Sequence, residues 1–109
     1  MKILWTLDQA QIFCTELEKN ITNFGVGLTG SVLKNKQSSK DLDIILYPLS
    51  SNADNNLETL KSQLINFGMT LFIPNEQVIK HWRKKGSIDE KYVEIWLYNN
   101  KRVDIFLLK

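Results

Sequence analysis

The chain has 109 residues, 43% of them hydrophobic, and a formal net charge of +2 at neutral pH. This size and apolar content predict a single domain over residues 1–109 with one packed core, too short for separate catalytic and acceptor-binding domains. The small charge does not favour general nucleic-acid binding, and one cysteine with one histidine excludes a disulfide framework and a structural zinc site. No apolar run is long enough to span a membrane, so a cytoplasmic protein is expected.

The first elements expected along the chain are a helix and a short strand. Thr6 and Gln9 have the spacing of a capping box, and the apolar pattern that follows predicts a helix ending near Asn20. Residues 24–29 then predict a strand whose glycines would allow a ligand or another backbone to approach closely. The core-facing positions of the helix are Ala10, Phe13, Cys14, Leu17 and Ile21.

The middle of the chain carries the clearest strand. Residues 31–33 are expected to form one helical turn, and the polar residues 34–40 are expected to form a loop. Residues 41–47 predict a strand that ends at Pro48 and the asparagine-rich loop after it. A helix follows and ends at Gly68, and its expected buried stripe consists of Leu57, Leu60, Leu64, Ile65 and Phe67.

A strand, a shorter helix and a hairpin are expected in the remaining part. Residues 69–73 predict the strand, and Asn75 is a candidate cap for a helix that carries Val78, Ile79 and Trp82 and ends by Gly86. Two alternating segments, 92–98 and 101–108, flank an Asn-Asn pair suited to the positive φ of a tight primed turn. This order of elements predicts an α+β fold with a mixed sheet of about five strands.

Three aspartates stand on strands that are otherwise apolar. Asp41 and Asp43 are two positions apart, so they project from the same side of one strand, and Asp104 lies in the closing strand. Ionised carboxylates in such surroundings are costly unless they are paired or bind a metal, and a hard divalent cation would relieve their repulsion. The alternative is structural: each aspartate marks a strand end, and Asp104 pairs with Arg102 or a lysine across the sheet.

The aspartates are preceded by a small turn in a recognisable order. A strand that ends in Leu-Thr-Gly-Ser at residues 28–31, an Asp-x-Asp strand and a later strand with one aspartate resemble the polymerase-β-like nucleotidyltransferase superfamily. The resemblance covers most of the chain and is strongest to the small single-domain members found in prokaryotes and their viruses. It implies a minimal nucleotidyltransferase fold, with the helices packed mainly on one face of the mixed sheet.

The resemblance also implies a role for each residue of the pattern. Gly30 and Ser31 would hold the phosphates of a nucleoside triphosphate such as ATP, while Asp41 and Asp43 would bind two Mg²⁺ ions, with Mn²⁺ as an alternative. Asp104 would complete the metal site and face the acceptor. The sequence departs from the family at Lys40, where members often carry a small residue. This lysine would contact a phosphate or point outward.

The implied activity is transfer of a nucleoside monophosphate to a protein, an RNA or a small molecule by a two-metal mechanism. Two other functions stay open: an interaction protein, such as the nucleotidyltransferase half of a toxin–antitoxin pair with a helical partner, and a metal–nucleotide binding module without turnover. Glu94 would replace Asp104 if the hairpin were displaced by one strand. His81 is expected on the surface, and Trp5, Trp82 and Trp96 are expected to pack in the core more than to stack on a base.

Overall fold

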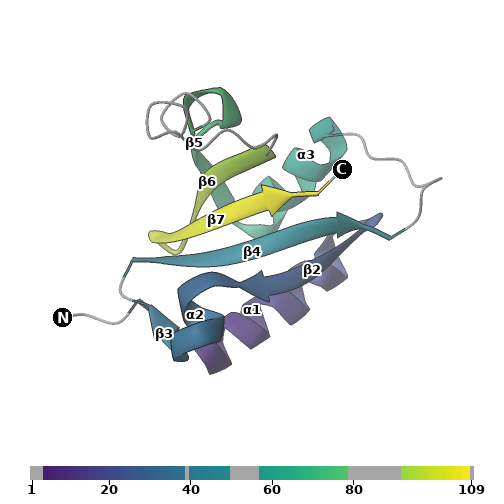
Figure 1. Cartoon of the computed structure of the whole chain (residues 1–109). Helices are drawn as coiled ribbons and strands as arrows, with labels where there is room; N and C mark the ends of the chain where they lie inside the picture. The colour runs from purple at the N-terminus through teal and green to yellow at the C-terminus, as the bar shows by residue number, and fades with distance from the viewer. Residues whose placement is uncertain (1–3, 39, 50–56, 79–91, 109) are drawn as a thin grey trace.

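The computed structural model describes residues 4–38, 40–49, 57–78 and 92–108 and shows a mixed α+β architecture (Figure 1). A five-stranded sheet has the order β2-β4-β7-β6-β5, and a two-stranded sheet pairs β1 with β3. The predicted α+β class and the predicted mixed sheet of about five strands are therefore confirmed. The elements are β1 (Trp5–Thr6), α1 (Leu7–Asn20), β2 (Phe24–Thr29), α2 (Gly30–Asn35), β3 (Gln37–Ser38), β4 (Asp41–Pro48), α3 (Leu57–Phe67), β5 (Met69–Ile73), β6 (Tyr92–Tyr98) and β7 (Lys101–Leu107).

The centre of the large sheet is one parallel pair. Strands β4 and β7 run in the same direction, whereas β2–β4, β6–β7 and β5–β6 are antiparallel. The β6–β7 hairpin turns through Asn99 and Asn100, whose φ angles of 52° and 62° are those of the predicted primed turn. Since β4 and β7 are neighbours, residues that begin these two strands come to lie side by side although they are far apart in the sequence.

One face of the sheet forms the main core. Alternate residues of β4 point to this face, where Leu42, Ile44 and Leu46 have no exposed surface. Helices α1 and α3 cover it, and Figure 1 shows both behind the sheet. Their buried residues are Ala10, Phe13 and Leu17 from α1 and Leu60 and Leu64 from α3. A smaller cluster of Val78, Val93 and Ile95 lies apart from this core.

Helix α1 confirms the predicted start and end. The Thr6 hydroxyl accepts a hydrogen bond from the Gln9 backbone N–H at 3.2 Å, and the Gln9 side chain accepts one from the Thr6 N–H at 3.1 Å. The helix ends at Asn20. Within the described ranges, no helix combines the length and the apolar character that a membrane crossing requires.

The segment between β2 and β4 differs from the prediction. Helix α2 continues to Asn35, beyond the single turn expected at residues 31–33, and ends where Lys36 adopts a φ of 65°. The next two residues, expected in a loop, form β3 and pair with β1, with Ser38 opposite Trp5. The partner strand is distant in the sequence, so the local polar pattern carries no sign of this pairing.

Two expectations about helices are also wrong. Ile65 is 59% exposed, because the buried face of α3 follows the narrower series of Leu60 and Leu64. Residues 75–78 are helical, so Asn75 is inside the helix, and its side chain instead accepts a hydrogen bond from the Val93 N–H at 2.9 Å. The predicted continuation of this helix through Ile79, His81, Trp82 and Gly86 lies outside the described residues.

Candidate metal centre

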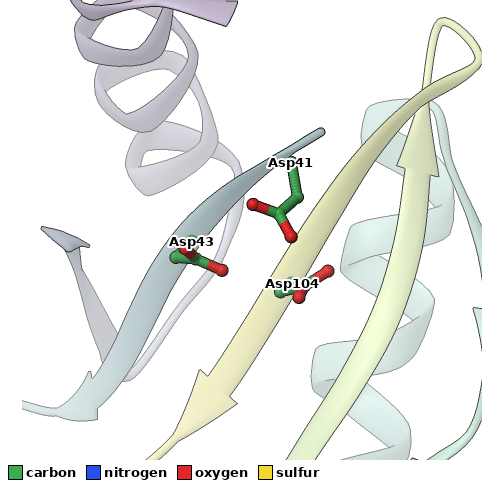
Figure 2. Close-up of side chains that lie close together, drawn as sticks. All are labelled: Asp41, Asp43 and Asp104. Carbon is green, nitrogen blue, oxygen red and sulfur yellow. The ribbon is translucent and has the colours of Figure 1, made fainter. Parts of the chain in front are cut away.

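Three carboxylates converge on the sheet face opposite the main core. The parallel register places Asp43 of β4 directly beside Asp104 of β7, and Asp41 lies two positions earlier on β4. One carboxylate oxygen from each aspartate lies within 4.8 Å of the other two. Figure 2 shows the three side chains close together on neighbouring strands. The structure thus brings together the three aspartates that the sequence pattern singled out.

The surroundings favour the neutral forms of two of these carboxyls. Burial raises the pKa of Asp43 to about 6, and the nearby charges of Asp41 and Asp104 raise it in the same direction. Burial and the charge of Asp104 also raise the pKa of Asp41 above its ordinary value. Both pKa shifts therefore reflect first the cost of burying a charged carboxylate and second the repulsion between neighbouring carboxylates. Three oxygen donors of this kind fit a hard divalent cation such as Mg²⁺.

The Gly-Ser turn abuts the same cluster. Thr29 pairs with Asp43 across the β2–β4 ladder, so the turn that follows it begins beside the carboxylate. Gly30 has a φ of 75°, and a Cβ atom at this position would collide with the Asp43 carboxylate. The Ser31 backbone N–H donates a hydrogen bond to Asp43 and thereby lowers the pKa of this carboxyl against the stronger raising effects. Glycine is therefore required by both the backbone conformation and the available space.

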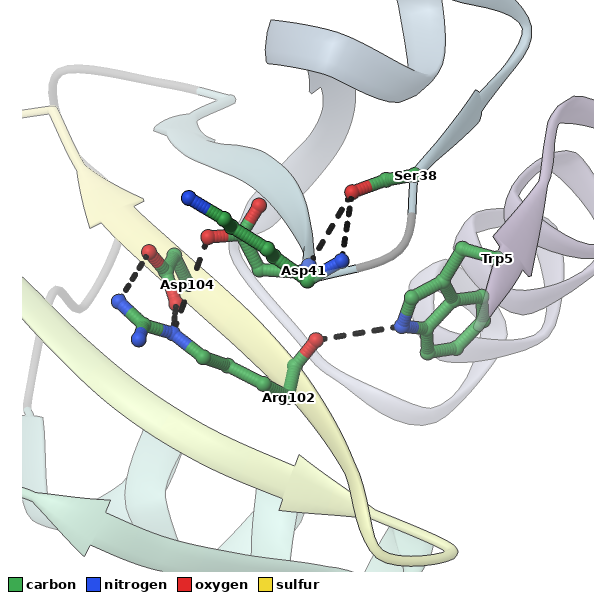
Figure 3. A network of polar contacts seen from close by, with 6 residues as sticks. Trp5, Ser38, Asp41, Arg102 and Asp104 are labelled. Atoms are coloured by element: carbon green, nitrogen blue, oxygen red, sulfur yellow. Dashed lines mark hydrogen bonds and ion pairs between the residues drawn. The ribbon is translucent and has the colours of Figure 1, made fainter. Parts of the chain in front are cut away.

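Arg102 supplies the cationic partner within the cluster. Its Nε and Nη2 atoms donate to the two oxygens of Asp104 at 2.7 and 3.0 Å, and Nε lies 3.8 Å from Asp41 Oδ2 (Figure 3). The hydrogen bond to Asp104 raises the pKa of Arg102. The pairing of Asp104 with Arg102 that the structural alternative expects is thus present. Among the described residues, this guanidinium forms ion pairs with two of the three carboxylates.

Residues of the small β1–β3 sheet hold the backbone at the start of β4. The Ser38 hydroxyl accepts hydrogen bonds from the backbone N–H groups of Lys40 and Asp41, both at 3.2 Å. The Trp5 indole N–H donates to the Arg102 carbonyl at 3.2 Å, and the Trp5 ring is buried against Phe13. Figure 3 shows the Ser38 hydrogen bonds at the start of β4 and the Trp5 hydrogen bond to the Arg102 carbonyl. Sequence reasoning missed both roles. The Trp5–Arg102 contact joins residues 97 apart and leaves no local pattern, whereas the Ser38 contacts are local, and a serine three residues before Asp41 is a signal that could have found them.

The other residues considered from the sequence lie differently. Lys40 is exposed and precedes Asp41 in the chain, and its positive charge lowers the pKa of the Asp41 carboxyl. Glu94 lies on the face of the sheet opposite Asp104, because its neighbour Ile95 is the residue that pairs with Asp104. There Glu94 is buried, accepts a hydrogen bond from the Asn75 N–H at 3.2 Å and lies 3.4 Å from the Lys61 ammonium. It therefore cannot replace Asp104 in this register. Trp5 and Trp96 are core residues, only 2% and 1% exposed.

The candidate site consists of the three carboxylates, the Arg102 guanidinium and the Gly-Ser turn, and it is defined by their geometry alone. No protein-family model matches the chain, and no curated protein sequence is significantly similar to it.

Proposed function

We propose that the protein is a metal-dependent nucleotidyltransferase, similar to the small single-domain members of the polymerase-β-like superfamily. The observation that carries this proposal is the meeting of Asp41, Asp43 and Asp104 within 4.8 Å, directly beside the Gly30–Ser31 turn. Three carboxylates that converge next to a Gly-Ser turn are better suited to binding a metal-bound polyphosphate than to forming structural ion pairs alone. An enzyme that consumes nucleoside triphosphates would work in the cytoplasm.

Each residue has a place in the proposed transfer. Asp41 and Asp43 would hold two Mg²⁺ or Mn²⁺ ions, with Asp104 as a further ligand on the acceptor side. When bound, these ions supply charge stabilisation for the attacking and leaving oxygens. Ser31 would bind the β- or γ-phosphate through its hydroxyl, and Gly30, whose missing Cβ leaves room for the Asp43 carboxylate, would keep the turn close to that phosphate. Asp104 would orient the acceptor hydroxyl and help to take its proton, while Lys40 lies near enough to Asp41 to attract a phosphate.

Labelled nucleotides provide the direct test. The protein is incubated with Mg²⁺, a cell lysate and each nucleoside triphosphate labelled at the α-phosphate, and the products are treated separately with protease and ribonuclease. We expect label in a protein, an RNA or a small molecule, with pyrophosphate released, because the α-phosphate stays with the acceptor. The Asp41→Asn/Asp43→Asn double variant should give no label. Equal labelling by the wild type and this variant, or none by either, would contradict the proposal.

Asp104→Asn separates transfer from mere binding. Asp41, Asp43 and the Gly-Ser turn remain in this variant, so we expect nucleotide affinity measured by calorimetry to change little. Single-turnover transfer should fall by a factor of about 10² or more, which corresponds to a loss of about 3 kcal/mol in transition-state stabilisation. Wild-type transfer rates in Asp104→Asn would contradict the three-aspartate mechanism. Nucleotide binding without transfer in the wild type would instead identify a binding module.

A further inference from the structure

The Arg102 guanidinium binds the Asp104 oxygens that one of the proposed cations would use as ligands. Its fork binds both oxygens of Asp104, and the same Nε atom lies 3.8 Å from Asp41. A cation held between Asp41 and Asp104 would have to share these oxygens with the guanidinium, and the two positive charges would repel each other. The Asp104 side of the cluster is therefore neutralised by the chain itself.

Asp43 lies outside this arrangement. It accepts a hydrogen bond from the Ser31 N–H, and the ion pairs of Arg102 go to Asp41 and Asp104. Both hydrogen bonds of the Arg102 fork go to Asp104, so Asp41 and Asp43 are the two carboxylates of the cluster at which a first cation would not have to displace that fork. The two halves of the site therefore differ in what must move before they bind a metal.

The Arg102 side chain is able to leave while its backbone stays in place. The Arg102 carbonyl is held by the Trp5 indole at 3.2 Å, and its backbone pairs with Asp41 across the parallel ladder. The side chain itself is 43% exposed, so its guanidinium can turn into solvent or onto a bound phosphate without disturbing the core. The Asp104 end of the pair is only 11% exposed, so the fork opens only when a second cation at Asp104 replaces the contacts that the guanidinium gives up.

We infer that Arg102 is an internal counter-ion that must release Asp104 before the acceptor-side cation binds, so that the site fills in a fixed order. The inference rests on the proposed function for the identity of the two cation positions. The first cation enters between Asp41 and Asp43, where the triphosphate would bind. The second enters at Asp104 only after the fork has opened. Arg102 is thus a positioning residue that acts through Asp104. The second cation binds only after the guanidinium has moved away from Asp104.

Mn²⁺ binding without nucleotide tests this order. Electron paramagnetic resonance counts free Mn²⁺, so it gives the number of bound ions and their affinities for the wild type, Arg102→Gln and Arg102→Lys. We expect one tight and one weak ion in the wild type. In Arg102→Gln the second ion should bind about tenfold more tightly or better, because the competing fork is absent. Arg102→Lys keeps the charge without the fork, so its second affinity should lie between the two.

Lys19→Gln is the matched control, because it makes the same charge change at an exposed position on α1, behind the opposite face of the sheet. It should bind Mn²⁺ like the wild type. Two ions of equal affinity in the wild type, or a second affinity that Arg102→Gln leaves unchanged or weakens, would overturn the inference while leaving nucleotide transfer intact. If Arg102→Gln does not fold, a second affinity in Arg102→Lys no higher than in the wild type overturns it. Absence of Mn²⁺ binding in every protein would overturn the proposed function as well.

Discussion

Asp43 gives the metal-free protein an unusual dependence on pH. Its folded pKa of about 6 lies above the ordinary value of 3.8, so the folded state binds this proton more tightly than the unfolded state does. The stabilisation is fully present below about pH 4 and is lost as the pH rises through about 6. Because the Asp43 side chain is only half-buried, solvent screens part of this effect. We expect protonation of Asp43 to add about 1 to 2 kcal/mol to the free energy of unfolding.

Urea unfolding at intervals from pH 4 to pH 7 measures this contribution. Asp43→Asn should flatten the fall in the free energy of unfolding over that range, because an amide does not titrate. Asp8→Asn, an exposed residue in the first turn of α1, is the matched control and should keep the wild-type profile. Superimposable profiles for Asp43→Asn and the wild type would show that Asp43 is not the group responsible.

Gly30 is expected to tolerate no side chain. In Gly30→Ala the new Cβ would meet the Asp43 carboxylate while the backbone keeps a φ of 75°, so both contact and conformation are unfavourable. We expect a loss of about 1 to 3 kcal/mol in the free energy of unfolding and weaker Mg²⁺ binding. Gly27→Ala provides the comparison, because its Cβ would find only ordinary contacts at 3.8 Å and beyond. Equal effects of the two substitutions would contradict a special role for Gly30.

At the scale of elements, the β1–β3 pair controls how β4 begins. Ser38→Ala removes the acceptor of two backbone N–H groups at the start of β4, in a position that is only 8% exposed. We expect a loss of about 1 to 3 kcal/mol in stability, with a several-fold loss in metal affinity as Asp41 becomes less well placed. Urea unfolding and Mn²⁺ titration measure the two effects. Ser38→Thr keeps the hydroxyl and should keep the wild-type stability and metal affinity. Wild-type stability in Ser38→Ala would contradict the proposed role of the Ser38 hydroxyl.

The elements that could be predicted from the sequence are those whose causes are local. The capping box of α1, the apolar alternation of β4 and the Asn-Asn turn of the last hairpin each lie within a few residues, and the structure contains all three. The β1–β3 pairing and the exposure of Ile65 depend on which distant segments lie alongside. Local periodicity could not supply them.

The candidate site was predictable in its residues but only partly in its geometry. Two aspartates on one strand must share a face, so the pairing of Asp41 with Asp43 followed from strand geometry alone. Their convergence with Asp104 requires β4 and β7 to be parallel neighbours in one particular register. The bidentate contact of Arg102 with Asp104 depends in addition on side-chain direction, and the sequence predicted only that Asp104 could pair with Arg102 or with a lysine across the sheet.

For the whole molecule, cation binding should appear as added stability. A divalent ion that binds the folded state alone contributes about 2.7 kcal/mol at a hundredfold excess over its Kd, which raises the Tm of a domain this small on the order of 10 °C. We expect Mg²⁺ or Mn²⁺ to produce such a rise at pH 7, measured by calorimetry, and Asp41→Asn/Asp43→Asn to abolish it. An equal rise in the double variant would mean that the ions bind elsewhere.

The position of β7 has a consequence for biosynthesis. This strand follows the other four in the sequence, yet it lies between β4 and β6 in the sheet. During translation, β4 therefore cannot pair with its parallel neighbour until β7 has emerged from the ribosome. Asp104 and Arg102 belong to that same strand, so neither the centre of the sheet nor the carboxylate cluster is complete before β7 pairs with β4. A nascent chain that lacks β7 would thus hold only Asp41 and Asp43 of the three carboxylates.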